Sequence, residues 1–153
     1  MQQRIGTITR NTKETQITLT INLDGSGKAD ISTGIGFFDH MLNSFARHGL
    51  FDLTVKATGD LEVDCHHTIE DVGIVLGQAI AQAVGDKKSI CRYGDCILPM
   101  DEALILCAID LSGRPYLVFD STFSSDMVGY FDTQMVKEFF YAISYSAGMN
   151  LHI

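Results

Sequence analysis

The chain has 153 residues, of which 46% are hydrophobic and 20% are charged, and it carries a formal net charge of −8. This composition is enough for one globular domain with its own core and too little for two ordinary domains. The negative charge argues against a nucleic-acid or anionic-membrane partner, but it does not exclude a small phosphorylated substrate.

Hydrophobic patterning in the first 84 residues predicts strands, a helix, further strands and a second helix. The predicted strands are residues 15–23, 28–32, 51–57 and 61–64, and the predicted helices are residues 38–47 and 68–84. We expect the first two strands to form a hairpin around a turn at residues 24–27. Gly49 should end the first helix, and residues 61–64 should pair back after a turn at Gly59 and Asp60.

The same kinds of element resume after residue 92. The predicted strands are residues 93–98, 103–111, 116–121 and 149–153, and the predicted helix is residues 133–147. Residues 38–55 and 136–153 also resemble each other, since each reads as a helix, a glycine and a short strand. This internal repeat predicts two similar halves, residues 1–92 and residues 93–153.

The termini and the cysteines indicate a cytoplasmic protein. The first 15 residues lack the apolar run of a secretory signal, and the most apolar stretches, residues 72–84 and 103–111, are too short or too interrupted to span a bilayer. The four cysteines form no CxxC pair, so we expect reduced thiols.

A cluster of histidines carries the main functional signal. Four of the five histidines lie between residues 40 and 67, and two of them open the longest predicted helix, in the sequence HHTIED from His66 to Asp71. Glu70 is three residues from His67 and four from His66, so either pairing could converge on one metal ion. Adjacent helical residues project about 100° apart, so the two histidines should serve two ions, or one ion and a neighbouring subunit. Imidazole with carboxylate suits Mn, Fe, Co or Zn.

Other interpretations of these residues stay open from the sequence. His66 and His67 could simply cap the helix, with Glu70 and Asp71 favoured by the helix dipole. His40 could be a buried, hydrogen-bonded histidine rather than a ligand. The arginines at the predicted strand edges, Arg92 and Arg114, could clamp a phosphate or form surface ion pairs.

Several segments, taken in order, resemble the imidazoleglycerol-phosphate dehydratase family. The matching segments are residues 10–15 (RNTKET), 34–42 (GIGFFDHML), 47–52 (RHGLFD), 66–79 (HHTIEDVGIVLGQA), 92–95 (RYGD), 99–103 (PMDEA), 110–116 (DLSGRPY) and 131–140 (FDTQMVKEFF). They cover nearly the whole chain, and together they are very specific.

The resemblance implies an α+β fold of two similar halves, each a β-sheet with helices packed on one face, of the ribosomal protein S5 domain 2-like kind. It also implies a large symmetric homo-oligomer built from trimers, with active sites between subunits. The family's second HHxxE helix and its phosphate-binding tail should follow Ile153, so we expect the second half to be incomplete. The chain is then either the lyase, with that sequence continuing, or a truncated protomer that cannot turn over.

The resemblance further implies a reaction and its residues: dehydration of imidazole glycerol phosphate to imidazole acetol phosphate, in histidine biosynthesis, with two Mn²⁺ ions per active site. The residues that match metal ligands are His40, His66, His67, Glu70 and Glu138. The residues that match substrate contacts are Glu14, His40, His48, His66, His67, Arg92 and Arg114. Glu14 and Glu70 are the expected catalytic residues, with Glu14 as the candidate proton shuttle.

Overall fold

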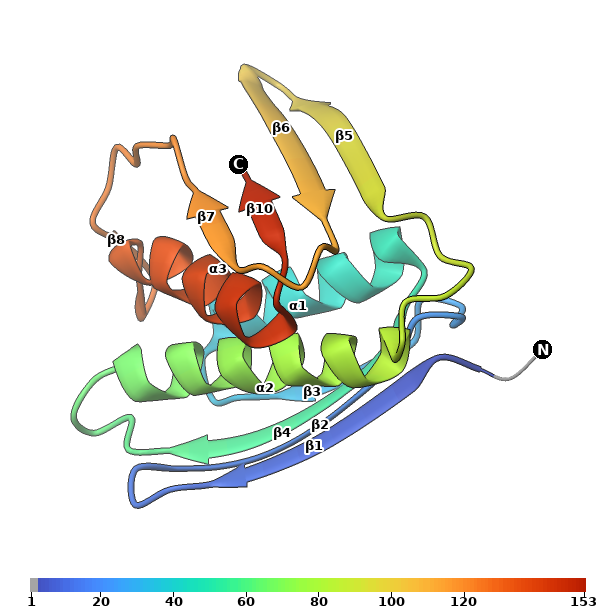
Figure 1. Cartoon of the computed structure of the whole chain (residues 1–153). Coiled ribbons are helices and arrows are strands. Elements are labelled where there is room, and N and C mark those ends of the chain that lie inside the picture. The colour runs from blue at the N-terminus through green and yellow to red at the C-terminus, as the bar shows by residue number, and fades with distance from the viewer. Residues whose placement is uncertain (1–2) are drawn as a thin grey trace.

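Two four-stranded sheets with the same strand order organise the computed structural model, which describes residues 3–153 (Figure 1). The first sheet has the order β1-β2-β4-β3 and contains β1 (Ile5–Asn11), β2 (Thr15–Asn22), β3 (Ala29–Ser32) and β4 (Asp52–Gly59). The second has the order β5-β6-β10-β7 and contains β5 (Tyr93–Met100), β6 (Ala103–Asp110), β7 (Tyr116–Val118) and β10 (Asn150–His152). A separate ribbon pairs β8 (Met127–Val128) with β9 (Phe131–Asp132), and the helices are α1 (Gly36–Gly49), α2 (His66–Val84) and α3 (Gln134–Ala147). The expected α+β class is confirmed.

The two sheets also share their strand directions. In each, the first two strands are antiparallel, and the last strand in the chain lies between the second and third strands, antiparallel to the second and parallel to the third. α1 leads into β4 as α3 leads into β10, so the internal repeat seen in the sequence corresponds to a repeated helix–strand unit. Residues 1–2 of the expected first half lie outside the described residues.

The core lies between the first sheet and two layers of helix. Ile17, Leu19 and Val55 point inward from the sheet and are buried under α2, and α3 packs on the other side of α2 (Figure 1). Gly73 and Gly77 let these two helices approach closely: a Cβ at Gly77 would lie 2.7 Å from the carbonyl oxygen of Ile143. The start of α2 therefore has a fixed position relative to the first sheet.

Two sequence-based expectations for the first half are wrong. Residues 28–32 do not form a hairpin with β2, because β1 and β4 occupy both edges of β2; instead, β3 pairs in parallel with β4. Residues 61–63 form a turn, and no strand forms over residues 61–64. The helix α1 ends at Gly49, as expected, and the left-handed residue after it is Leu50 (φ 57°).

One strand of the first sheet, β1, lacked a hydrophobic signal in the sequence. Its buried position at Gly6 faces α2 so closely that a Cβ there would lie 1.9 Å from the carbonyl oxygen of Ala79. A strand that packs through glycine shows no apolar alternation.

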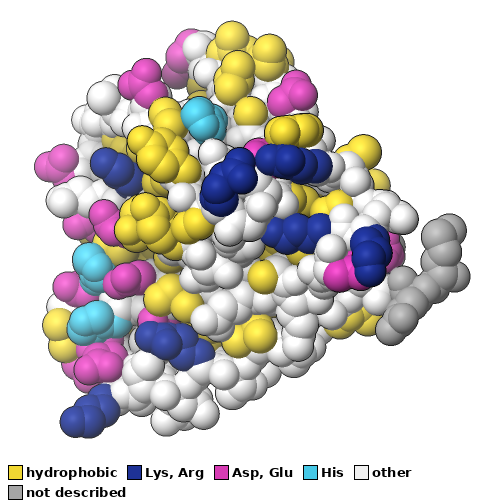
Figure 2. Space-filling view, in the orientation of Figure 1, with side chains coloured by type: hydrophobic (Ala, Val, Ile, Leu, Met, Phe, Trp, Pro, Cys, Tyr) yellow, Lys and Arg dark blue, Asp and Glu magenta, His cyan; other side chains and the backbone are white. Residues whose placement is uncertain are grey.

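Much of the second sheet is exposed and apolar. All eight residues of β5 are exposed, and Ile97, Leu98 and Leu104 are each more than 60% exposed. Apolar side chains accordingly gather at the top of Figure 2, over β5 and β6. Among the described residues, no helix is long and apolar enough to cross a membrane.

Candidate active site

The first turn of α2 presents two imidazoles to solvent. The carboxylate of Asp64 accepts a hydrogen bond from the backbone N–H of His66 at 2.7 Å. Asp64, rather than a histidine side chain, therefore pairs one of the backbone N–H groups that have no partner within the helix. The side chains of His66 and His67 are 49% and 46% exposed. The interpretation of these histidines as helix caps is therefore wrong. Histidine and acidic side chains gather at the left of Figure 2, over the beginning of α2.

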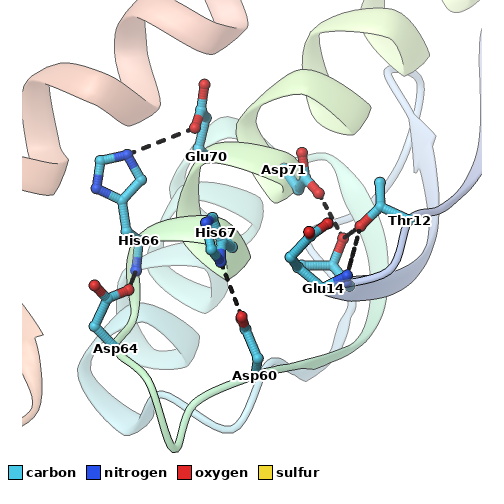
Figure 3. Close-up of polar contacts among 9 residues, drawn as sticks. Thr12, Glu14, Asp60, Asp64, His66, His67, Glu70 and Asp71 are labelled. Atoms are coloured by element: carbon cyan, nitrogen blue, oxygen red, sulfur yellow. Dashed lines mark hydrogen bonds and ion pairs between the residues drawn. The ribbon is translucent and has the colours of Figure 1, made fainter.

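His66 points toward Glu70, one turn further along the helix (Figure 3). Nε2 of His66 lies 3.6 Å from Oε2 of Glu70, and the Glu70 side chain is 44% exposed. An imidazole nitrogen and a carboxylate oxygen at this separation can both bind one divalent ion after a small side-chain rotation. The predicted pairing of these two residues is thus available in the fold.

His67 points away from His66 and toward Asp60, as Figure 3 shows. Its Nδ1 lies 2.9 Å from Oδ2 of Asp60. This hydrogen bond raises the pKa of His67, and the charges of Asp60, Glu14 and Asp64 raise it further, against a lowering by desolvation. Adjacent positions on a helix diverge by about 100°, so the two imidazoles face different surroundings.

The loop between β1 and β2 brings Glu14 close to His67. The hydroxyl of Thr12 accepts hydrogen bonds from the backbone N–H groups of Glu14 (3.1 Å) and Thr15 (2.9 Å), which holds the loop in one conformation. The Glu14 side chain itself is exposed. A carboxylate held in this way is free to contact a bound molecule.

Buried Asp71 ties this loop to α2. It accepts hydrogen bonds from the hydroxyl of Thr15 (2.5 Å) and from Nε of Arg10 (2.9 Å). Sequence reasoning missed the roles of Asp71, Asp60 and Thr12. A signal for Asp71 was present, since it shares the apolar face of α2 with Val72 and Val75, where a carboxylate needs a partner.

The remaining predicted ligands are on other elements. His40 and His48 are exposed on α1, and Glu138 is exposed on α3, so the interpretation of His40 as a buried histidine is wrong. Within residues 3–153, no three His, Cys, Asp or Glu side chains lie close enough together to hold one metal ion. The fold therefore assembles the His66–Glu70 and His67–Asp60 pairs, but not a full set of ligands.

The two predicted phosphate-binding arginines are near the second sheet. Arg92 forms a two-point ion pair with Asp110, through Nε at 2.6 Å and Nη2 at 3.0 Å, and this pair lowers the pKa of Asp110. The surface ion pair considered for Arg92 is confirmed. Arg114 is exposed just before β7, and its carbonyl oxygen accepts a hydrogen bond from Asn150.

A hollow of about 500 Å³ opens beside His66. It is lined by Gly34, Ile35, Leu61, Asp64, Cys65, His66, Met127, Tyr130, Asp132 and Met135. Its volume is in the range of small-ligand sites. This lining includes two aspartates but neither Lys nor Arg, so a phosphate group would have to be held elsewhere.

Comparison with known proteins identifies a family for this arrangement. The model of the imidazoleglycerol-phosphate dehydratase family matches residues 33–153. The dehydratase of Lachnoclostridium phytofermentans is 67% identical over 150 residues, which are 98% of this chain and 76% of that protein. The dehydratase of Acetivibrio thermocellus is 66% identical over 146 residues, covering 95% of this chain and 75% of that protein.

Solved structures support the same relationship. The crystal structure of the dehydratase from Staphylococcus aureus superposes with a TM-score of 0.85 at 40% identity, covering 97% of this chain and 81% of that one. The enzyme from Pyrococcus furiosus superposes with a TM-score of 0.80 at 35% identity, covering 95% of this chain and 77% of that one.

Proposed function

Because the chain belongs to the imidazoleglycerol-phosphate dehydratase family, hydro-lyases of histidine biosynthesis, we propose that it dehydrates imidazole glycerol phosphate in a Mn²⁺-dependent reaction. The observation that carries the metal part of this proposal is the pairing of His66 with Glu70 at the exposed start of α2. Next to this pair, His67 has one ring nitrogen bound to Asp60 and the other available.

The donor groups at the start of α2 fit manganese in kind. Imidazole nitrogen and carboxylate oxygen are the ligands that borderline-to-hard divalent ions take, and the pair is not buried among apolar groups that would exclude an ion. A complete site needs more ligands than residues 3–153 bring together. Neighbouring copies of the chain supply the others, with exposed His40 and Glu138 as candidates. Two Mn²⁺ ions per site are expected.

Sites shared between subunits require an assembly, and the two sheets differ in a way that supports one. On the outer face of the first sheet, threonines pair with each other, as in Thr7 with Thr20 at 3.0 Å. The second sheet instead exposes apolar side chains, among them Leu104 (67%) and Leu106 (54%). Exposed apolar area of this kind is typical of contact surfaces. A homo-oligomer built from trimers would cover it.

The reaction removes a hydroxide from the carbon attached to the imidazole ring and a proton from the following carbon, and the resulting enol becomes a ketone at that second carbon. Bound divalent ions would supply Lewis acidity at the ring, which stabilises the deprotonated ring and so helps the hydroxide on the attached carbon to leave. Glu14, near His67 and exposed, accepts the proton from carbon or delivers one to the departing hydroxide. His48 and Arg114 bind the substrate from their exposed positions, and Arg92 does so if phosphate replaces Asp110 as its partner.

The test is an assay of the purified chain with imidazole glycerol phosphate, with added Mn²⁺ and after treatment with a chelator. We expect keto product only when the metal is present, and a loss of turnover in the His67→Ala and Glu70→Gln variants. His152→Ala is a matched control, because this exposed histidine lies on β10, in the other sheet. Equal activity after metal removal would contradict the proposal. Metal binding without turnover would favour the non-catalytic alternative.

A further inference from the structure

The hydrogen bond between Asp60 and His67 determines which ring nitrogen carries the proton. Oδ2 of Asp60 lies 2.9 Å from Nδ1 of His67. An ionised carboxylate can only accept hydrogen bonds, so the proton of a neutral His67 must be on Nδ1. Nε2 then carries the lone pair, on the side of the ring away from Asp60. Figure 3 shows His67 held in this way above Asp60.

The backbone on either side of Asp60 is fixed by close contacts, so the Asp60 side chain has a defined position beside His67. Asp60 follows Gly59, the last residue of β4, and a Cβ at Gly59 would lie 2.0 Å from the hydroxyl of Thr68 in the first turn of α2. The backbone N–H of Val63 donates to the carbonyl oxygen of Asp60 at 2.8 Å and closes the turn. The backbone before Asp60 is thus packed against the first turn of α2, and the backbone after it is closed into a turn.

The surroundings of Asp60 are unfavourable for stability alone. Its side chain is only 20% exposed, and its second oxygen, Oδ1, is buried with no hydrogen-bond partner among residues 3–153. A buried carboxylate oxygen without a donor destabilises the folded state. Asp60 thus lowers stability through Oδ1, while its other oxygen orients a functional histidine. Such a loss of stability in favour of function is common at functional sites.

We propose that Asp60 is a positioning residue, which holds His67 in the Nδ1–H tautomer and directs the Nε2 lone pair outward to bind a divalent metal ion. This role rests on the proposed function, since it assigns the metal-facing nitrogen of a proposed ligand. Carboxylates commonly orient metal-binding histidines in this way. Asp60 does not contact the ion itself and acts through His67.

The experiment compares Asp60→Ala and Asp60→Asn with Glu62→Gln, a matched control in the same turn whose acidic side chain is exposed. In the metal-free wild type, ¹⁵N NMR of labelled histidine should show His67 with its proton on Nδ1 at a pH where the ring is neutral. Asp60→Ala should shift the ring to a mixture of tautomers, and Asp60→Asn should give an intermediate result, because its amide oxygen still accepts a hydrogen bond.

Two further readouts separate positioning from a structural role. Mn²⁺ affinity, measured by titration, should fall about 10- to 100-fold in Asp60→Ala and stay unchanged in Glu62→Gln. Thermal unfolding of metal-free Asp60→Ala should occur at the same temperature as the wild type or higher. Unfolding at a clearly lower temperature would assign Asp60 a structural role and overturn the proposal.

The failure of this proposal can be distinguished from that of the proposed function. A mixed tautomer in the wild type, or unchanged tautomer and Mn²⁺ affinity in Asp60→Ala, overturns the role of Asp60 while leaving the dehydratase assignment intact. A wild-type chain that binds no Mn²⁺ would overturn both the metal part of the function and the metal-directed role of Asp60. The NMR measurement would still establish whether Asp60 sets the tautomer.

Discussion

Thr15 donates its hydroxyl hydrogen to Oδ2 of Asp71, and both side chains are buried. This bond joins the start of β2 to the first turns of α2. On one side of it lies Glu14 and on the other Glu70, each adjacent in sequence to a residue of the pair. The relative position of the two expected catalytic carboxylates therefore depends on a contact between their neighbours.

Replacing Asp71 with Ala should destabilise the fold by about 2 kcal/mol, because two hydrogen bonds to a charged group are lost and the buried Thr15 hydroxyl keeps only the hydroxyl of Thr12 as a partner. Thr15→Val, which leaves the Arg10–Asp71 pair in place, should cost less. Thr9→Val is the control, since the Thr9–Thr18 hydrogen bond is exposed. Urea denaturation measures the free energy of unfolding of all three variants. A similar decrease in Thr9→Val and Asp71→Ala would show that the buried contact stabilises the fold no more than an exposed one.

Gly77→Ala should destabilise the chain by about 1–3 kcal/mol through overpacking between α2 and α3. The new Cβ would meet the backbone of Ile143 at 2.7 Å, and backbone atoms cannot move aside as a flexible side chain can. At Gly36, a Cβ would meet nothing within 4 Å, so Gly36→Ala should be neutral or slightly stabilising. Thermal unfolding of both variants checks this, and an unchanged Gly77→Ala protein would mean that the helices can separate freely.

Glu14→Gln should lower kcat by about 10²- to 10⁴-fold, the usual contribution of a positioned general acid or base. The amide keeps the size of the side chain and can no longer transfer the proton. Mn²⁺ binding and circular dichroism should be unchanged, because the loop is held by Thr12 and Thr15 rather than by the Glu14 side chain. Full activity of this variant, measured beside Glu62→Gln, would remove Glu14 from the mechanism.

The carboxylate of Asp52 should contribute stability that depends on pH. It accepts hydrogen bonds from the backbone N–H groups of Ser26 (2.8 Å) and Lys28 (3.0 Å), which lower its pKa. A lowered folded-state pKa means that the contribution is complete above the unfolded-state value and is lost as pH falls through the folded-state value. Asp52→Ala should therefore unfold at a lower temperature than the wild type at pH 7, and the difference should shrink well below about pH 4. A difference that does not vary with pH would assign the effect to packing.

Cys107 should react more slowly with iodoacetamide than Cys91. Burial, and to a smaller degree the facing Cys96, raise the pKa of the Cys107 thiol, so less thiolate is present at neutral pH. Cys91 is exposed. Mass spectrometry of timed samples measures the order, and the difference should disappear in denaturant. Equal rates in the folded protein would indicate that β6 opens readily.

Local patterning was enough to find the three helices and most of the strands. The apolar spacing that predicted a helix at residues 68–84 is the spacing of the buried residues of α2, and the alternation in residues 15–23 became β2. The HHxxE spacing also placed His66 and Glu70 on one side of the helix, as the fold confirms. These features depend on residues within a turn or two of each other, which a single sequence displays directly.

Only the tertiary structure determined the partners of these elements. The strand β3 pairs with β4 because both edges of β2 are already occupied. The strand β1 packs through Gly6 because α2 lies very close to it. The Asp71–Thr15 contact joins side chains 56 positions apart in the chain. The sequence by itself determined which residue types face inward and which carry the chemistry. The fold decided which of them meet, because contacts between distant segments are set by packing and backbone geometry rather than by local spacing.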